Sequence, residues 1–94
     1  MYSVSSGVRC TRDEGGGTVL DINQGKVFRL NGTAVLIVER LRQNAEIAEI
    51  IAEISRVHGI SSKTVEVDVI DFLGLLENQG LVKCNRSVTA PGEN

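Results

Sequence analysis

Few of the residues on which enzymes and nucleic-acid binders rely occur in this chain of 94 residues. Tryptophan is absent, and Tyr2, Phe28 and Phe72 are the only aromatic residues. Proteins that bind single-stranded nucleic acid stack the bases on displayed aromatic rings, so the composition does not favour that function. The sequence also offers little catalytic chemistry. His58 is the only histidine, and its place near the end of a predicted helix favours a structural role.

A nucleophile paired with a base, and a His/Cys cluster with metal-ligand spacing, are both missing. We therefore predict a protein that is not an enzyme and has no cofactor and no metal site. The two cysteines, Cys10 and Cys84, lie far apart and form no CxxC pair. Two reduced, half-buried thiols are the expected state of such cysteines in a cytosolic protein.

Long apolar runs are missing as well. No segment approaches the roughly 20 apolar residues that cross a bilayer. The first residues lack the basic and then apolar pattern of a signal peptide. The net charge is −2 with a pI near 5.3, without the excess of Lys and Arg that a phosphate-binding surface needs. We expect a cytoplasmic protein that binds neither nucleic acid nor membrane.

Three short strands are predicted first, at residues 8–13, 18–23 and 26–30. Each alternates in polarity, and glycine-containing turns at residues 15–17 and 24–25 separate them. The alternation predicts that Leu20 and Ile22 share one face of the second strand. In the third strand it predicts Phe28 and Leu30 on one face, with Val27 and Arg29 on the other. Two consecutive hairpins give an antiparallel sheet in chain order, with 26–30 as an edge strand.

Three helices follow, each with a capping signal. Asn31 is the expected N-cap of a helix that reaches about Gln43, and Asn44 that of a helix from Ala45 to His58, which Gly59 ends. Ser61 can cap a third helix that reaches Gln79 before Gly80. Apolar residues recur at helical spacing along all three helices. In the third helix these apolar residues are Val65, Val69, Phe72, Leu73 and Leu76.

This order predicts an α+β fold of the winged helix-turn-helix-like type, a three-stranded antiparallel sheet followed by three helices. We expect one domain over residues 8–84, with flexible tails at 1–7 and 85–94. The helix-turn-helix leaves nucleic-acid binding or regulation as an alternative function. Against it, the third helix carries Lys63 beside four carboxylates, a formal sum of −3, which would repel phosphates.

The edge strand offers a second functional hypothesis. Its outward N–H and C=O groups lack partners, so an extended peptide could add there as a fourth strand. If the third helix forms the other wall, its acidic and apolar residues would select the side chains of the peptide. The residues alone do not decide between this hypothesis and an edge strand without a binding role. In the second case, Lys26 and Arg29 would protect the edge from aggregation.

Two stretches resemble a known family. Residues 17–31, with Leu20-Asp21, Gly25 and the run from Phe28 to Asn31, resemble the strand–turn–strand–cap region of PqqD-like proteins. Residues 68–82 resemble their last helix with its Gly-Leu ending. The resemblance covers roughly residues 8–83. At Asn23-Gln24-Gly25 the chain lacks the Pro-Glu usual in pyrroloquinoline quinone assembly, and looks more like the stand-alone recognition elements of lasso-peptide clusters.

The resemblance implies a non-catalytic element that binds the leader segment of a ribosomally made precursor peptide. Its implied partners are that precursor and a modifying enzyme, such as a leader peptidase, a cyclase or a radical enzyme. We expect a monomer or a weak homodimer. The resemblance implies that the peptide adds beside the third strand and against the last helix. The implied peptide-binding residues are Lys26, Val27, Phe28, Arg29, Leu30, Val65, Asp68, Val69, Phe72 and Leu73.

Overall fold

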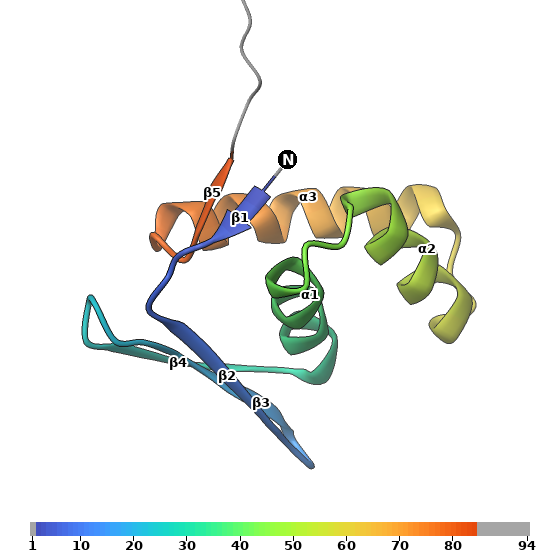
Figure 1. The fold of residues 1–94 in the computed structure, drawn as a ribbon. Helices are drawn as coiled ribbons and strands as arrows, with labels where there is room; N and C mark the ends of the chain where they lie inside the picture. Colours follow the sequence, from blue (N-terminus) through green and yellow to red (C-terminus); the bar gives the residue numbers. More distant parts are fainter. Residues whose placement is uncertain (1, 85–94) are drawn as a thin grey trace, which may run out of the picture.

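A three-stranded antiparallel sheet, three helices and a small two-stranded sheet form residues 2–84, the part of the chain that the computed structural model describes (Figure 1). The predicted α+β class is confirmed. The elements in chain order are β1 (Tyr2–Val4), β2 (Val8–Asp13), β3 (Gly16–Asp21), β4 (Lys26–Leu30), α1 (Gly32–Arg42), α2 (Ile47–His58), α3 (Ser62–Asn78) and β5 (Val82–Cys84).

The larger sheet has the predicted order β2-β3-β4, with one-to-one pairing along both ladders. Its inner face carries Val19, which is buried opposite Cys10 on one side and Phe28 on the other. The strand predicted at residues 18–23, with Leu20 and Ile22 on one face, is displaced toward the N-terminus, and both of these side chains are exposed. The strand starts at Gly16 and ends at Asp21, so Val19 and Asp21 point inward and Ile22 lies in the turn.

Helix α1 packs on the inner face of this sheet and separates it from α3 (Figure 1). Gly17 allows the close approach: a Cβ atom there would lie 2.6 Å from Cγ2 of the buried Val35. Gly17 was predicted to belong to a turn, yet it lies within β3. The absence of a side chain at Gly17 therefore allows α1 to lie this close to the sheet.

The predicted tail at residues 1–7 is also corrected. Residues 2–4 form β1, which pairs antiparallel with β5, so that Tyr2 lies opposite Cys84 and Val4 opposite Val82. Ser5 continues the contact, because its N–H donates to the carbonyl of Leu81 at 2.9 Å. The predicted tail at 85–94 lies outside the described residues.

The helix ends follow the capping predictions, with one exception. Asn31 Oδ1 accepts a hydrogen bond from Ala34 N at 2.8 Å, and Ser61 caps α3 in the same way. Gly59 ends α2 with a φ of 65°. Asn44 does not cap α2. It has a φ of 63° in the link after α1, and Glu46 begins α2 instead through a reciprocal capping box.

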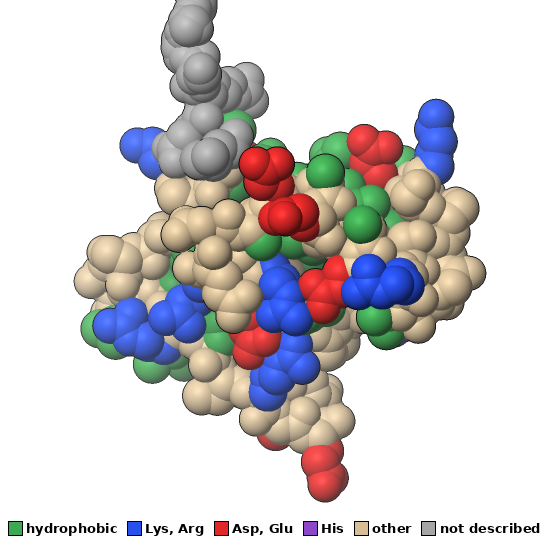
Figure 2. Space-filling model, turned by 45° about the vertical axis from the view of Figure 1, so that its right-hand side comes forward, with side chains coloured by type: hydrophobic (Ala, Val, Ile, Leu, Met, Phe, Trp, Pro, Cys, Tyr) green, Lys and Arg blue, Asp and Glu red, His purple; other side chains and the backbone are tan. Residues whose placement is uncertain are grey.

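The apolar faces of the helices and of the sheet meet in one core. Its buried residues come from every layer: Val8, Val19, Ile37, Val38, Leu41, Ile50, Ile54, Val65, Val69, Leu73, Leu76, Leu81 and Val82. Ion pairs link the layers at the surface, and Figure 2 shows blue and red side chains alternating across the middle of one face. Arg40 holds Glu53 by two hydrogen bonds of 2.9 Å between α1 and α2, and Arg12 holds Glu39 between β2 and α1.

Asp21 is the one buried charged residue among residues 2–84, with 1% of its surface exposed. Its carboxylate accepts hydrogen bonds from the backbone N–H groups of Asn23 and Gln24 and from Gln24 Nε2. The same Nε2 donates to the carbonyl of Gln79, at the end of α3, at 3.0 Å. The β3–β4 turn is therefore hydrogen-bonded to the last turn of α3.

The hydrogen bond from the Gln24 side chain, together with those from the turn, holds the pKa of Asp21 below its ordinary value. An aspartate with a lowered pKa stabilises the folded state above its unfolded pKa, and this contribution is lost as the pH falls through the folded pKa. We predict that Asp21→Asn lowers the melting temperature by several degrees at neutral pH. The difference from the wild type should shrink under acid. Thermal melts of both proteins across the acid range test this, and an equal difference at every pH would contradict it.

Candidate functional site

Strand β4 is an edge strand in the described part of the chain, because it pairs with β3 alone. The direction of its backbone groups follows from the ladders. Ile22 N donates to Gly7 O at 2.9 Å, one step beyond the pair of Val8 and Asp21. Hydrogen-bonded pairs alternate along an antiparallel ladder, so Asp21, Val19 and Gly17 direct their backbone groups toward β4.

Their partners in β4 therefore bond back to β3. These partners are Lys26, Phe28 and Leu30. The intervening residues, Val27 and Arg29, direct their N–H and C=O groups away from the sheet. Two donors and two acceptors thus form an open row at this edge, which is the pattern that an added strand can bond.

The side chains of β4 divide between the two faces of the sheet. Phe28 and Leu30 are half-buried against the core, whereas Val27 is 66% exposed on the outer face. Arg29 also lies on the outer face, where its Nη2 donates to Asp13 Oδ1 at 2.6 Å. This hydrogen-bonded pairing lowers the pKa of Asp13 and raises that of Arg29, so both side chains are charged. The ion pair occupies the face of the sheet and leaves the strand edge open.

One side of α3 runs beside this edge. At the Lys26 end of β4, the turn is tied to Gln79 through Gln24. At the Leu30 end, Asn31 and Phe72 line the same groove. One side of the helix carries residues spaced by four, three and four positions, namely Asp68, Phe72, Leu75 and Gln79. Leu75 lies between the two ends and is 62% exposed.

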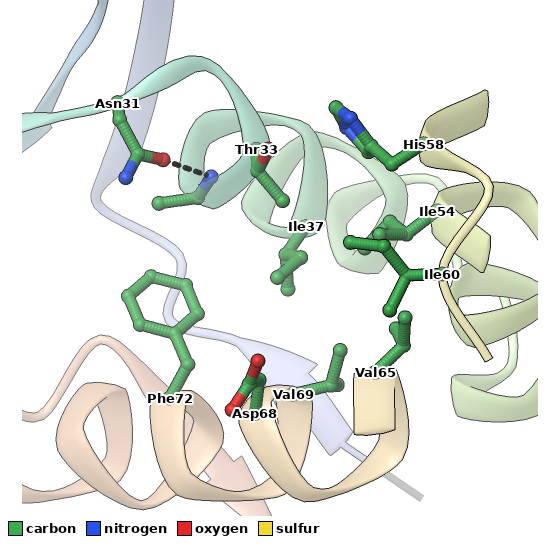
Figure 3. Close-up of a pocket in the computed structure, with 11 residues that line it drawn as sticks. Asn31, Thr33, Ile37, Ile54, His58, Ile60, Val65, Asp68, Val69 and Phe72 are labelled. Carbon is green, nitrogen blue, oxygen red and sulfur yellow. Dashed lines mark hydrogen bonds between the residues drawn. The ribbon is translucent and has the colours of Figure 1, made fainter. Parts of the chain in front are cut away.

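The groove at the Leu30 end has a volume of about 330 Å³ and lies between the start of α1, the end of α2 and α3 (Figure 3). Its floor is apolar, and in Figure 3 Phe72 and Ile37 point into it from opposite sides. The lining residues are Asn31, Thr33, Ala34, Ile37, Ile54, His58, Ile60, Val65, Asp68, Val69 and Phe72.

Polar groups are few in this groove. Asn31 already uses its side-chain oxygen as the N-cap of α1. Asp68 and His58 are the ionisable residues of the lining, and within residues 2–84 the Asp68 side chain forms no hydrogen bond or ion pair. An apolar floor beside one carboxylate suits an apolar side chain with a polar or cationic neighbour.

The groove brings together four of the five residues predicted on the last helix, Val65, Asp68, Val69 and Phe72. The fifth, Leu73, does not line it and is only 1% exposed in the core. Sequence reasoning missed Leu75, although its spacing of three from Phe72 signals the same side of the helix. It also missed the residues that α1 and α2 contribute, such as Thr33 and Ile60, because only the packing of the helices brings them here.

Other chemistry is sparse in the described residues 2–84. They contain no group of three His, Cys, Asp or Glu residues that could hold a metal ion. Cys10 and Cys84 are free and half-buried, and burial raises the pKa of the Cys10 thiol. None of the helices described is long and apolar enough to span a bilayer. Within residues 2–84, the open edge of β4 and the groove are therefore the candidate binding features.

Solved structures with this fold are similar over nearly the whole chain. One is TbiB1 in complex with the TbiA(beta) leader peptide, with 25% identity, a TM-score of 0.80, and coverage of 90% of this chain and 99% of that one. Another is a lasso peptide synthetase B1 complexed with the leader peptide, with 22% identity, a TM-score of 0.77, and coverage of 88% and 98%.

A third is the PqqD truncation of Methylobacterium extorquens PqqCD, a stand-alone RiPP recognition element, with 18% identity, a TM-score of 0.71, and coverage of 88% of both chains. No curated protein matches the sequence. The family model of coenzyme PQQ synthesis protein D (PqqD) matches residues 16–82, from the start of β3 to the start of β5. This match spans well over half of the chain, and the chain therefore belongs to the PqqD family.

Proposed function

We propose that this protein binds the leader segment of a ribosomally synthesised precursor peptide as a fourth strand beside β4, and presents it to a modifying enzyme. The observation that carries the proposal is the open row of backbone groups at Val27 and Arg29, beside the exposed side of α3. Family membership supports it, and so does the likeness to TbiB1, which was solved with a leader peptide.

Backbone bonds and side-chain contacts have separate roles in this mechanism. The bonds at β4 give affinity that depends little on the peptide sequence. Alternate side chains of the added strand point toward α3, where Phe72 and Leu75 provide apolar contacts. At the Leu30 end, an apolar side chain of the leader enters the groove. In this mechanism the groove determines which leader sequence binds, and the edge of β4 holds the leader backbone as an extended strand.

The protein acts as a scaffold in this proposal, without chemistry of its own. Binding would raise the local concentration of the precursor at the enzyme that modifies it. The candidate enzymes are a leader peptidase, a cyclase or a radical enzyme, in a cytoplasmic pathway such as that of a lasso peptide or of pyrroloquinoline quinone. The domain over residues 8–84 is the proposed binding unit, and β1, which precedes it, pairs with β5 at its end.

Strand addition predicts a specific effect of proline at Val27. Val27→Pro removes an outward N–H and breaks no bond to β3, so the fold should survive. We expect affinity for a fluorescent peptide of the cognate leader to fall about tenfold or more, the effect of one lost hydrogen bond and a displaced strand. Val27→Ala is the matched control, because it keeps the N–H and should bind within a factor of about two or three. Fluorescence anisotropy measures both, and unchanged binding by the proline variant would exclude addition at this edge.

Substitutions of two leucines in α3 distinguish a contribution to leader binding from a contribution to stability. Leu75→Ala should weaken leader binding about tenfold, yet change the free energy of unfolding by less than about 0.5 kcal/mol, because Leu75 is exposed. Leu73→Ala should cost about 2–5 kcal/mol of stability, because it leaves a cavity in the core. Urea unfolding and anisotropy of both variants distinguish the two roles. Full affinity of the Leu75→Ala variant would remove this side of α3 from the site.

The carboxylate in the groove predicts an electrostatic contribution. Asp68→Asn keeps the shape of the side chain and removes its charge. We expect several-fold weaker leader binding at low ionic strength and a smaller loss of affinity when salt is added, because salt screens exposed charges. Titrations at two salt concentrations test this. A salt dependence identical to that of the wild type would show that Asp68 does not contact a cationic group.

A further inference from the structure

A polar hollow lies where β1, β2 and the end of α1 meet, apart from the edge of β4 and from the groove. It has a volume of about 220 Å³, and its lining comes from residues 3–6, 8–9, 41–42 and 44. Two arginines belong to this lining, Arg9 of β2 and Arg42 in the last turn of α1, and no carboxylate does. The hollow therefore gathers positive charge on a chain whose net charge is −2.

Neither guanidinium group has an acidic partner. None of the three ion pairs within residues 2–84 involves Arg9 or Arg42. The backbone positions Arg9, because its Nη1 donates to the carbonyls of Ser6 and Val8, both at 3.1 Å, which leaves other N–H groups of the guanidinium for a ligand. Burial raises the pKa of the Cys10 thiol, and the adjacent Arg42 opposes that rise. Arg42 therefore lies beside β2, on the same side as the hollow.

The carboxylates adjacent in sequence to this hollow are already engaged. Glu39 of α1 is held by Arg12 at 2.8 Å, and Glu46 is used in the capping box of α2. Carbonyls at a helix C-terminus carry partial negative charge, but those of residues 39–41 accept hydrogen bonds from the N–H groups of residues 43–45. The positive charge of the two arginines is thus left for a ligand.

Neutral donors complete the lining. Ser6 and Asn44 also line the hollow, and within residues 2–84 their side chains form no hydrogen bond. The sequence predicted Asn44 as the cap of α2, but with its φ of 63° it lies here instead. Two guanidinium groups, an amide and a hydroxyl can together donate to an anion with several acceptor oxygens.

We propose that this hollow binds a phosphate group, as the free anion or as part of a phosphorylated small molecule. Two unpaired guanidinium groups balance the charge of about −2 that a phosphate monoester carries at neutral pH, whereas a carboxylate has a single charge and fewer oxygens. The hollow shares no residue with β4 or with the lining of the groove. The inference therefore does not rest on the proposed function, and a phosphate and a leader can be bound together.

The test uses probes of defined chemistry. Inorganic phosphate, glycerol 3-phosphate and acetate are titrated into the full-length, isotope-labelled chain at constant ionic strength, and amide and arginine Nε–H shifts are followed by NMR. We expect saturable shifts at Ser6, Arg9, Arg42 and Asn44, with dissociation constants in the millimolar range for both phosphates and binding at least about fivefold weaker for acetate. Tighter binding of inorganic phosphate would identify the free anion as ligand, and tighter binding of the ester a phosphorylated compound.

Variants with one altered charge localise the contact. Arg9→Gln and Arg42→Gln change exposed residues, so the fold should be kept, and each should weaken phosphate binding about fivefold or more. Arg42→Lys keeps the charge and should bind with intermediate affinity. Arg56→Gln is the matched control, because it removes the same charge from an exposed position of α2 outside the hollow, and should bind within about twofold of the wild type. Thermal melts check that every variant is folded.

Several results would overturn the proposal. They are the absence of saturable shifts at the hollow, equal binding of acetate and phosphate, full affinity of both glutamine variants of the hollow, or an equal loss in the Arg56→Gln variant.

The two proposals fail separately in these experiments. Arg42→Gln should leave leader binding unchanged, and Val27→Pro should leave phosphate binding unchanged. Loss of leader binding in the Val27→Pro variant, with no phosphate binding by the wild type, would leave the proposed function standing and exclude the phosphate site. The reverse pattern would exclude strand addition and leave the phosphate site standing.

Discussion

The position of the open edge depends on one buried carboxylate. Asp21 ends β3 and accepts three hydrogen bonds within the β3–β4 turn. Through Gln24 the turn is tied to the carbonyl of Gln79 at the end of α3. A buried charge without such partners would be costly, so the hydrogen bonds and the burial require each other. Together they fix the turn before β4 against the end of α3.

This arrangement places the candidate site at the border of the core. Leu73 and Val69 hold α3 against the other helices, whereas Leu75 on the same helix is exposed. Phe72 lies between, half-buried against the core and lining the groove. Leu75 therefore lies outside the core, whereas Val65, Val69 and Phe72 belong both to the groove and to the core or its border. Substitution of the exposed Leu75 is expected to have little effect on stability.

Local signals predicted most of the elements because each depends on neighbours in the sequence. Asn31 and Ser61 cap their helices as predicted, and Gly59 takes the left-handed φ that its position after α2 suggests. The edge strand at 26–30 was also correctly predicted.

The errors arise where contacts between residues distant in the sequence determine the structure. Leu20 and Ile22 were predicted to share one face of a strand at residues 18–23, but the hydrogen bonds to Asp21 start the turn there, so Ile22 lies outside β3. Strands β1 and β5 are three residues each and pair across the length of the chain, so no local period reveals them. The groove likewise needs α1, α2 and α3 to meet.

The helix-turn-helix shape also raises the question of whether the exposed face of α3 suits a nucleic acid. A recognition helix donates to phosphates and base edges from its exposed face. In α3 that role would fall beside Glu66, Asp71 and Glu77, with Lys63 as its only cation. The negative charge repels a phosphate backbone but is harmless to a peptide, whose bonds at β4 are made by neutral backbone groups. The charge on α3 therefore disfavours the nucleic-acid alternative, while the edge of β4 offers backbone groups that a peptide can bond.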